Sequence, residues 1–169
     1  IYYAVQDTSG NGAAKVGVNL VVGGTFYLTK DITHRALDAT YTPAGNKDVI
    51  LDLQGHTLES LDMGNFPVGS FTLKNGTLNQ CVYSNAKGKL ILDGVTFMAS
   101  ATNNSSLDIT VQGKSVFKEK VSFSVVEGVV HLRGGTFEKG IDTSNGAQPL
   151  ALLADGYAFQ SDRGIVDAS

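Results

Sequence analysis

The stretch that decides the fold is Leu51-Asp52-Leu53-Gln54-Gly55-His56-Thr57-Leu58, because its pattern returns further along the chain. Gapless copies of this pattern occupy residues 71–78, 90–97, 109–116 and 130–137. Successive copies begin about 20 residues apart, which is the signature of a repeat protein in which each unit packs against its neighbours. The sequence therefore predicts a stack of similar coils.

Each copy has the pattern of a strand, a tight corner and a second strand. The reference position of each copy, its third residue, is apolar and is occupied by Leu53, Leu73, Leu92, Val111 and Leu132. The residue two places earlier is also apolar, and this alternation is typical of a strand with one buried face. Two places after the reference stands Gly or Asn, which tolerates the positive φ of a corner. A hydroxyl residue follows at Thr57, Thr77, Thr96, Ser115 and Thr136.

A unit of this kind cannot bury its apolar face alone, but stacked units bury a continuous inner column. We therefore predict an all-β fold, a β-solenoid. A helical repeat is disfavoured because β-branched and aromatic residues crowd the copies. A β-sandwich is the alternative, although its hairpins would not require five columns to agree in residue type.

The chain is expected to form a single domain over residues 1–169. Residues 1–24 fall outside the repeat and are predicted to form an N-terminal cap or an initial strand pair, and residues 25–146 hold the coils. Residues 147–169 are assigned to a C-terminal cap and tail. There, Pro149 and Gly156 bracket a segment with the signals of a short capping helix. Ile165 and Val166 are candidates for a final edge strand.

Residues 26–33, 43–47 and 49–58 resemble the opening of right-handed parallel β-helix repeats of the pectate-lyase-like kind. Residues 152–159 resemble a segment that closes such repeats, which occur in large secreted and cell-wall proteins of Gram-positive bacteria. The resemblance implies a short right-handed parallel β-helix of about 20-residue coils and an extracellular or cell-wall location. The superfamily includes polysaccharide lyases, hydrolases, tailspikes, adhesins and spacers, so the fold alone does not assign an activity.

Composition narrows the possible partners. Charged residues make up 17% of the chain, the formal net charge is −3, and no run of Lys or Arg occurs. Nucleic acid and membrane insertion are therefore not expected. The single cysteine, Cys81, excludes an intramolecular disulfide and is predicted to point inward as a small apolar residue. The expected partners are a polysaccharide or host glycoprotein and other domains of the same polypeptide.

Catalytic residues of that superfamily lie on the outer face of one sheet, on neighbouring coils. In this chain the columns flanking the reference contain five candidates for that role, Asp52, Lys74, Asp93, His131 and Arg133. The gapless register places Asp52 and Asp93 two coils and one column apart, with about 12 Å between their Cα atoms. The carboxyl groups of inverting glycosidases lie about 6.5 to 9.5 Å apart. The sequence therefore favours a non-catalytic module over an enzyme.

No metal or cofactor is expected. His34, His56 and His131 have no partner at a recognised metal spacing. The turn at residues 7–12 imitates half of a calcium loop, but Val18 stands where the loop's bidentate Glu belongs. The hydroxyl column is a candidate for binding ice or a sugar, with a ladder of Thr hydrogen bonds as the simpler interpretation. The tyrosines are candidates for stacking on sugars.

The function predicted from the sequence is a non-catalytic extracellular module of a larger bacterial secreted or surface protein, such as an adhesin. It would bind carbohydrate or a host component, or serve as a structural spacer. The alternative is a polysaccharide lyase or glycoside hydrolase of the β-helix type.

Overall fold

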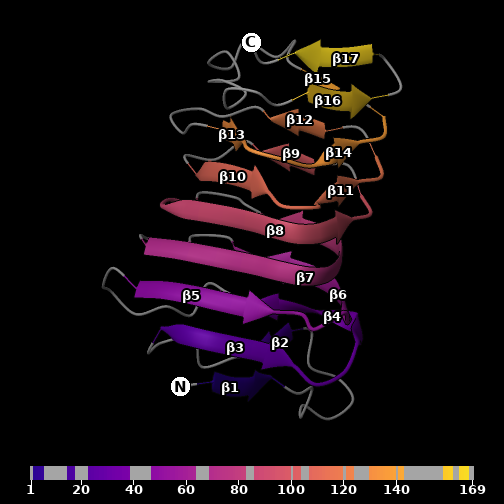
Figure 1. Ribbon diagram of the computed structural model, residues 1–169. Helices are drawn as coiled ribbons and strands as arrows, with labels where there is room; N and C mark the ends of the chain where they lie inside the picture. The colour runs from indigo at the N-terminus through magenta and orange to yellow at the C-terminus, as the bar shows by residue number, and fades with distance from the viewer. Residues whose placement is uncertain are drawn as a thin grey trace.

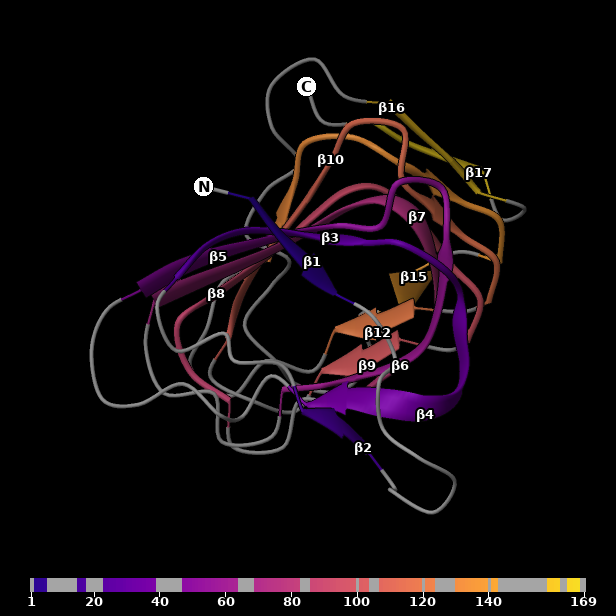
Figure 2. The same cartoon turned by 90° about the horizontal axis from the view of Figure 1, so that it is seen from below.

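A computed structural model describes residues 2–5, 15–17, 23–38, 47–63, 69–82, 86–99, 101–103, 107–119, 121–123, 130–139, 141–142, 158–161 and 164–167. These residues are all-β, and none of them lies in a helix. Parallel strands stack from the N-terminal end to the C-terminal end as a β-solenoid (Figure 1). The two views together show that the coils wind in a right-handed sense (Figures 1 and 2). The predicted solenoid is confirmed.

Two long ladders of parallel strands run along the stack. The first ladder consists of β1 (Tyr2–Val5), β3 (Gly24–Leu28), β5 (Lys47–Asp52), the start of β7 (Gly69–Val82), the start of β8 (Lys89–Phe97), β10 (Asp108–Gln112) and β13 (Val130–Leu132). The second ladder consists of β2 (Lys15–Gly17), β4 (Ile32–Asp38), β6 (Thr57–Asp62), the ends of β7 and β8, β11 (Val116–Phe117) and β14 (Thr136–Phe137). A shorter third ladder consists of β9 (Ala101–Asn103), β12 (Val121–Phe123) and β15 (Ile141–Asp142).

The two ends of the chain add strands to this stack. Within residues 1–24, β1 pairs in parallel with β3 and β2 with β4, so both long ladders extend into this region. At the other end β16 (Ala158–Ser161) and β17 (Gly164–Asp167) form an antiparallel pair that includes Ile165 and Val166. The helix predicted between Pro149 and Gly156 lies outside the described residues.

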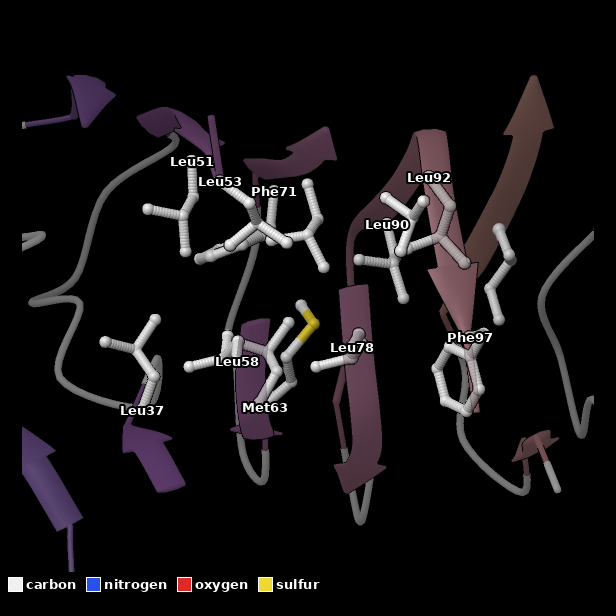
Figure 3. Packing of buried hydrophobic residues seen from close by; sticks show 14 of the residues in the cluster. Leu37, Leu51, Leu53, Leu58, Met63, Phe71, Leu78, Leu90, Leu92 and Phe97 are labelled. Atoms are coloured by element: carbon white, nitrogen blue, oxygen red, sulfur yellow. The ribbon is translucent and has the colours of Figure 1, made fainter. Parts of the chain in front are cut away.

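The interior is a continuous apolar column. Along β8, Leu90 and Leu92 are buried while Ile91 and Asp93 face outward and are half-buried, as strand alternation requires. Figure 3 shows the buried side chains of the first ladder and corner, such as Leu51 and Leu90, facing those of the second ladder, such as Leu58. Burial of each such side chain contributes about 1.5 to 3 kcal/mol.

The strand register differs from the gapless alignment at the first copy. Leu51 pairs with Leu73, whereas Thr57 pairs with Thr77 as expected. The first copy therefore has two more residues at its corner than the second. Its chain turns at Gln54 and Gly55, whose φ values are 50° and 83°. The predicted pairing of Leu53 with Leu73 is wrong because the corner absorbs extra residues without disturbing the alternation on either side.

A second correction concerns the fourth copy. Val116 pairs with Thr96 and with Thr136, so it takes the outward place predicted for Ser115. Ser115 is instead buried within the corner, where its Oγ lies 2.9 Å from the Gln112 carbonyl oxygen and accepts the Val95 N–H at 3.2 Å. The hydroxyl column is therefore interrupted at Val116.

The corrected register explains an aromatic stack in the core. Phe117 now occupies the inward position in line with Phe97 and Phe137. The ring centroids of Phe97 and Phe117 lie 5.6 Å apart and those of Phe117 and Phe137 lie 5.0 Å apart, with interplanar angles of 15° and 11°. These distances lie within the range at which aromatic pairs attract beyond their burial.

Candidate functional site

Three outward columns of side chains form the outer face of the first ladder, which we call the first-ladder face. The polar column contains Tyr27, Asp52, Lys74, Asp93 and Gln112. The central column contains Thr25, Ile50, Thr72, Ile91, Thr110 and His131. The rim column contains Asp48, Ser70, Lys89 and Asp108.

Four of the five candidate residues lie in the columns of this face, in a different arrangement from the prediction, and the fifth, Arg133, lies just beyond the end of β13. Asp52, Lys74 and Asp93 occupy the polar column on consecutive coils. His131 lies in the central column beside Thr110. Arg133 follows β13 and is exposed, and its N–H donates to the Val111 carbonyl oxygen at 2.7 Å. The register thus brings the two carboxylates and the lysine into one line.

Asp52 is held by its own corner and by the next coil. Its Oδ1 accepts the Gln54 N–H at 2.9 Å, and Asn75 Nδ2 donates to the same carboxylate at 3.2 Å and 3.3 Å. Lys74 Nζ lies 4.0 Å from Asp52 Oδ2, and the two side chains are 36% and 24% exposed. Asp52 therefore stabilises the corner that contains the extra residues.

Asp93 is held in a similar way. Its Oδ2 accepts a hydrogen bond from Gln112 Nε2 at 3.0 Å. Its Oδ1 lies so close to the next corner that a Cβ added at Gly113 would meet it at 2.4 Å. On the rim column Asp48 Oδ1 accepts the Ser70 hydroxyl at 2.6 Å. Each of these three carboxylates is thus bonded to the next coil.

The corrected register also changes the separation of the two candidate catalytic carboxylates. Asp52 and Asp93 share one column and lie two coils apart, which corresponds to about 10 Å between backbones rather than about 12 Å. That separation is close to the upper end of the range for inverting glycosidases, about 9.5 Å. Lys74 lies between the two carboxylates, where an inverting enzyme holds its attacking water.

Metal ligands do not gather in the described part of the chain. Within it, no group of three or more His, Cys, Asp or Glu side chains could hold a metal ion. The turn at residues 7–12 and the side chain of His34 lie outside what is described. Cys81 is half-buried and packs against the core. Among the described residues no helix is long and apolar enough to span a membrane.

A second polar contact, missed by the sequence analysis, joins two corners. Asp31 Oδ1 accepts the Thr57 N–H at 2.9 Å and lies 3.1 Å from His56 Nδ1. Asp31 precedes β4, and His56 precedes β6, one coil further along. The two side chains are 25 residues apart, which is not the spacing of about 20 between copies, so the repeat period gives no signal for this contact.

This contact predicts an acid-sensitive contribution to stability. The hydrogen bond from the Thr57 N–H, and then that from His56, hold the pKa of Asp31 below its ordinary value of 3.8. Because the folded pKa is depressed, the contribution is complete above the unfolded pKa and is lost as pH falls through the folded pKa. We expect Asp31→Ala to lower the urea midpoint at pH 7, with the difference from the wild type shrinking in acid below pH 3.8.

Asp31→Asn is the matched control, since it keeps an oxygen that can accept the Thr57 N–H but carries no charge. Its urea midpoint should lie between those of the wild type and Asp31→Ala at pH 7. A loss in Asp31→Ala that stays constant down to pH 2 would contradict the assignment.

Comparison with known proteins identified no relative of this chain. No family model matches it, and neither a curated protein nor a solved structure matches it significantly.

Proposed function

We propose that this chain is a non-catalytic extracellular module whose first-ladder face binds a carbohydrate chain. The proposal rests on the hydrogen bonds that three carboxylates of the face, Asp48, Asp52 and Asp93, accept from side chains of the next coil. A general acid or base must be free to exchange a proton with substrate. Carboxylates that are hydrogen-bonded to the next coil instead hold the surface in a fixed conformation.

The repetition of the face also supports a polymeric ligand. Each column presents one outward side chain per coil, at about 4.8 Å along the stack, and those of the polar and rim columns are all polar or charged. A polysaccharide is itself a chain of recurring hydroxyl groups, so one short set of contacts can be repeated along it. Tyr27, at one end of the polar column, would add an aromatic surface on which a sugar ring can stack.

The resemblance to pectate-lyase-like β-helix repeats supports the cellular setting. We propose that the chain belongs to a larger secreted or surface protein of a bacterium, located outside the cell or in the cell wall. In that setting a regular, non-catalytic face would act as an adhesin or an anchor to a polysaccharide.

Binding to a glycan array, alongside a pull-down with host glycoproteins, tests this proposal. Thr72→Trp places a bulky ring in the central column, and Thr77→Trp makes the same change on the second ladder of the same strand. We expect Thr72→Trp to weaken glycan binding about tenfold, equivalent to roughly 1.4 kcal/mol, while Thr77→Trp binds as the wild type. Binding to no glycan would contradict the proposal and leave a protein-binding module or a spacer.

The second candidate function is a glycoside hydrolase or lyase, favoured by the alignment of Asp52 and Asp93 in one column. Incubation with a panel of plant and host polysaccharides, with and without calcium, tests it by the appearance of reducing or unsaturated ends. We expect no product. A product that disappears in both Asp52→Asn and Asp93→Asn would instead establish catalysis at this face.

A further inference from the structure

We infer that the carbohydrate bound by the first-ladder face is a neutral polysaccharide rather than a polyanion. This inference rests on the proposed function and concerns the chemical class of its ligand. It follows from the order in which charges are placed along the three columns of the face.

Opposite charges alternate along the polar column. Asp52, Lys74 and Asp93 follow one another on consecutive coils, and Gln112 comes next. Lys74 therefore has a carboxylate on each side, one of them 4.0 Å away. Cross-strand pairs of opposite charge attract one another, so the cation is already partly neutralised by its own column.

The rim column also places a lysine between two carboxylates, but on different coils. Asp48 is followed by Ser70, then by Lys89, and then by Asp108, which lies opposite Lys89 in the register. Between the two charged columns, the central column presents Ile50, Thr72, Ile91 and Thr110 before it reaches His131, and these are apolar or hydroxyl side chains.

The face therefore has no continuous positive patch, because each of its two lysines lies in a column between carboxylates. Charges on adjacent coils of one column lie about 4.8 Å apart, which is shorter than the Debye length of about 8 Å at physiological salt. A polyanion laid along the stack would meet four carboxylates, Asp48, Asp52, Asp93 and Asp108, but only two lysines, Lys74 and Lys89. Contacts between like charges are unfavourable.

Neutral sugar hydroxyls suit the same side chains. A hydroxyl donates to carboxylates such as Asp93 and accepts from Lys74, while Gln112 and Thr72 can do both. Because no ion pair of the face must be broken to bind an uncharged chain, the affinity should depend little on salt.

Affinity electrophoresis of the wild-type protein tests the inference. The probes are soluble β-glucan, galactomannan and starch as neutral polymers, and polygalacturonate and heparin as anionic ones. We expect retardation by a neutral polymer, with a dissociation constant that changes less than about twofold between low and high salt. Retardation only by anionic polymers, with strong salt dependence, would overturn the inference and leave the proposed function intact. Retardation by none of them would contradict the proposed function itself.

A pair of charge variants locates the effect on the face. Thr72→Lys with Thr110→Lys adds two cations to the central column, and Thr77→Lys with Thr96→Lys adds two cations to the second ladder. The first variant should lose affinity for the neutral polymer and gain salt-dependent affinity for polygalacturonate, while the second keeps the wild-type affinity for the neutral polymer. Equal loss in both variants would overturn the assignment to this face.

Discussion

Replacing Gly76 with alanine is expected to destabilise the protein by about 3 kcal/mol or more, because the new methyl group has no room. A Cβ at Gly76 would lie 2.4 Å from the Leu53 Cβ and 2.5 Å from the His56 carbonyl oxygen. That carbonyl accepts the Thr77 N–H at 3.0 Å, so moving it away would also strain the ladder at this corner. The close approach exists because Leu53, in the longer preceding corner, is buried against Gly76.

Urea unfolding gives the measurement, with an expected fall of the midpoint by about 1.5 M for a slope of about 2 kcal/mol per molar. Gly55→Ala is the matched control. Nothing lies within 4 Å of a Cβ at Gly55, but its φ is +83°. Gly55→Ala should therefore lower the free energy of unfolding only by the backbone strain of a non-glycine residue, about 1 to 2 kcal/mol. Equal losses in the two variants would show that Gly76 has no packing role.

Phe117→Ala should cost about 3 to 5 kcal/mol, the usual range for removing a buried aromatic ring. Phe117 lies between Phe97 and Phe137 at centroid distances of 5.6 Å and 5.0 Å, so its loss breaks both ring contacts at once. The cavity would lie between the rings of Phe97 and Phe137, which the coils on either side cannot close without shifting both ladders. The fall in the urea midpoint measures the effect.

Val116→Ala is the control for this prediction, and it tests the register directly. In the gapless alignment Val116 points inward, whereas in the structure it points outward beside Thr96 and Thr136. Its truncation should therefore cost about 1 kcal/mol or less. A larger loss of stability in Val116→Ala than in Phe117→Ala would show that the gapless register is the right one.

The strands could be predicted from the sequence because side-chain alternation is a local property. Leu90 and Leu92 point inward and Ile91 and Asp93 outward wherever this segment pairs as a strand. The outward columns could be assigned for the same reason, since polar residues alternate with apolar ones in most of the copies. The charge order along the face depends instead on which residues of neighbouring coils lie side by side.

The corners could not be predicted in this way. One turn needs only Asn75 at a φ of 58°, while another uses Gln54 and Gly55 with positive φ at both. A corner can take one or two extra residues at small cost if its backbone tolerates positive φ, so its length leaves no periodic signal. The contacts of Asp52 with Asn75 and of Asp31 with His56 were missed because they join corners of different coils.

By itself the sequence determined that this protein is a stack of coils of about 20 residues with an apolar interior. The repeat period and the alternation of apolar and outward residues can both be seen in the sequence without knowing which coils are neighbours. The tertiary structure decided which residues of adjacent coils meet. It placed Asp52, Lys74 and Asp93 in one column and Phe117 between Phe97 and Phe137. The physical reason is that hydrogen bonding between coils sets the register strand by strand, while the corners take up the difference in length.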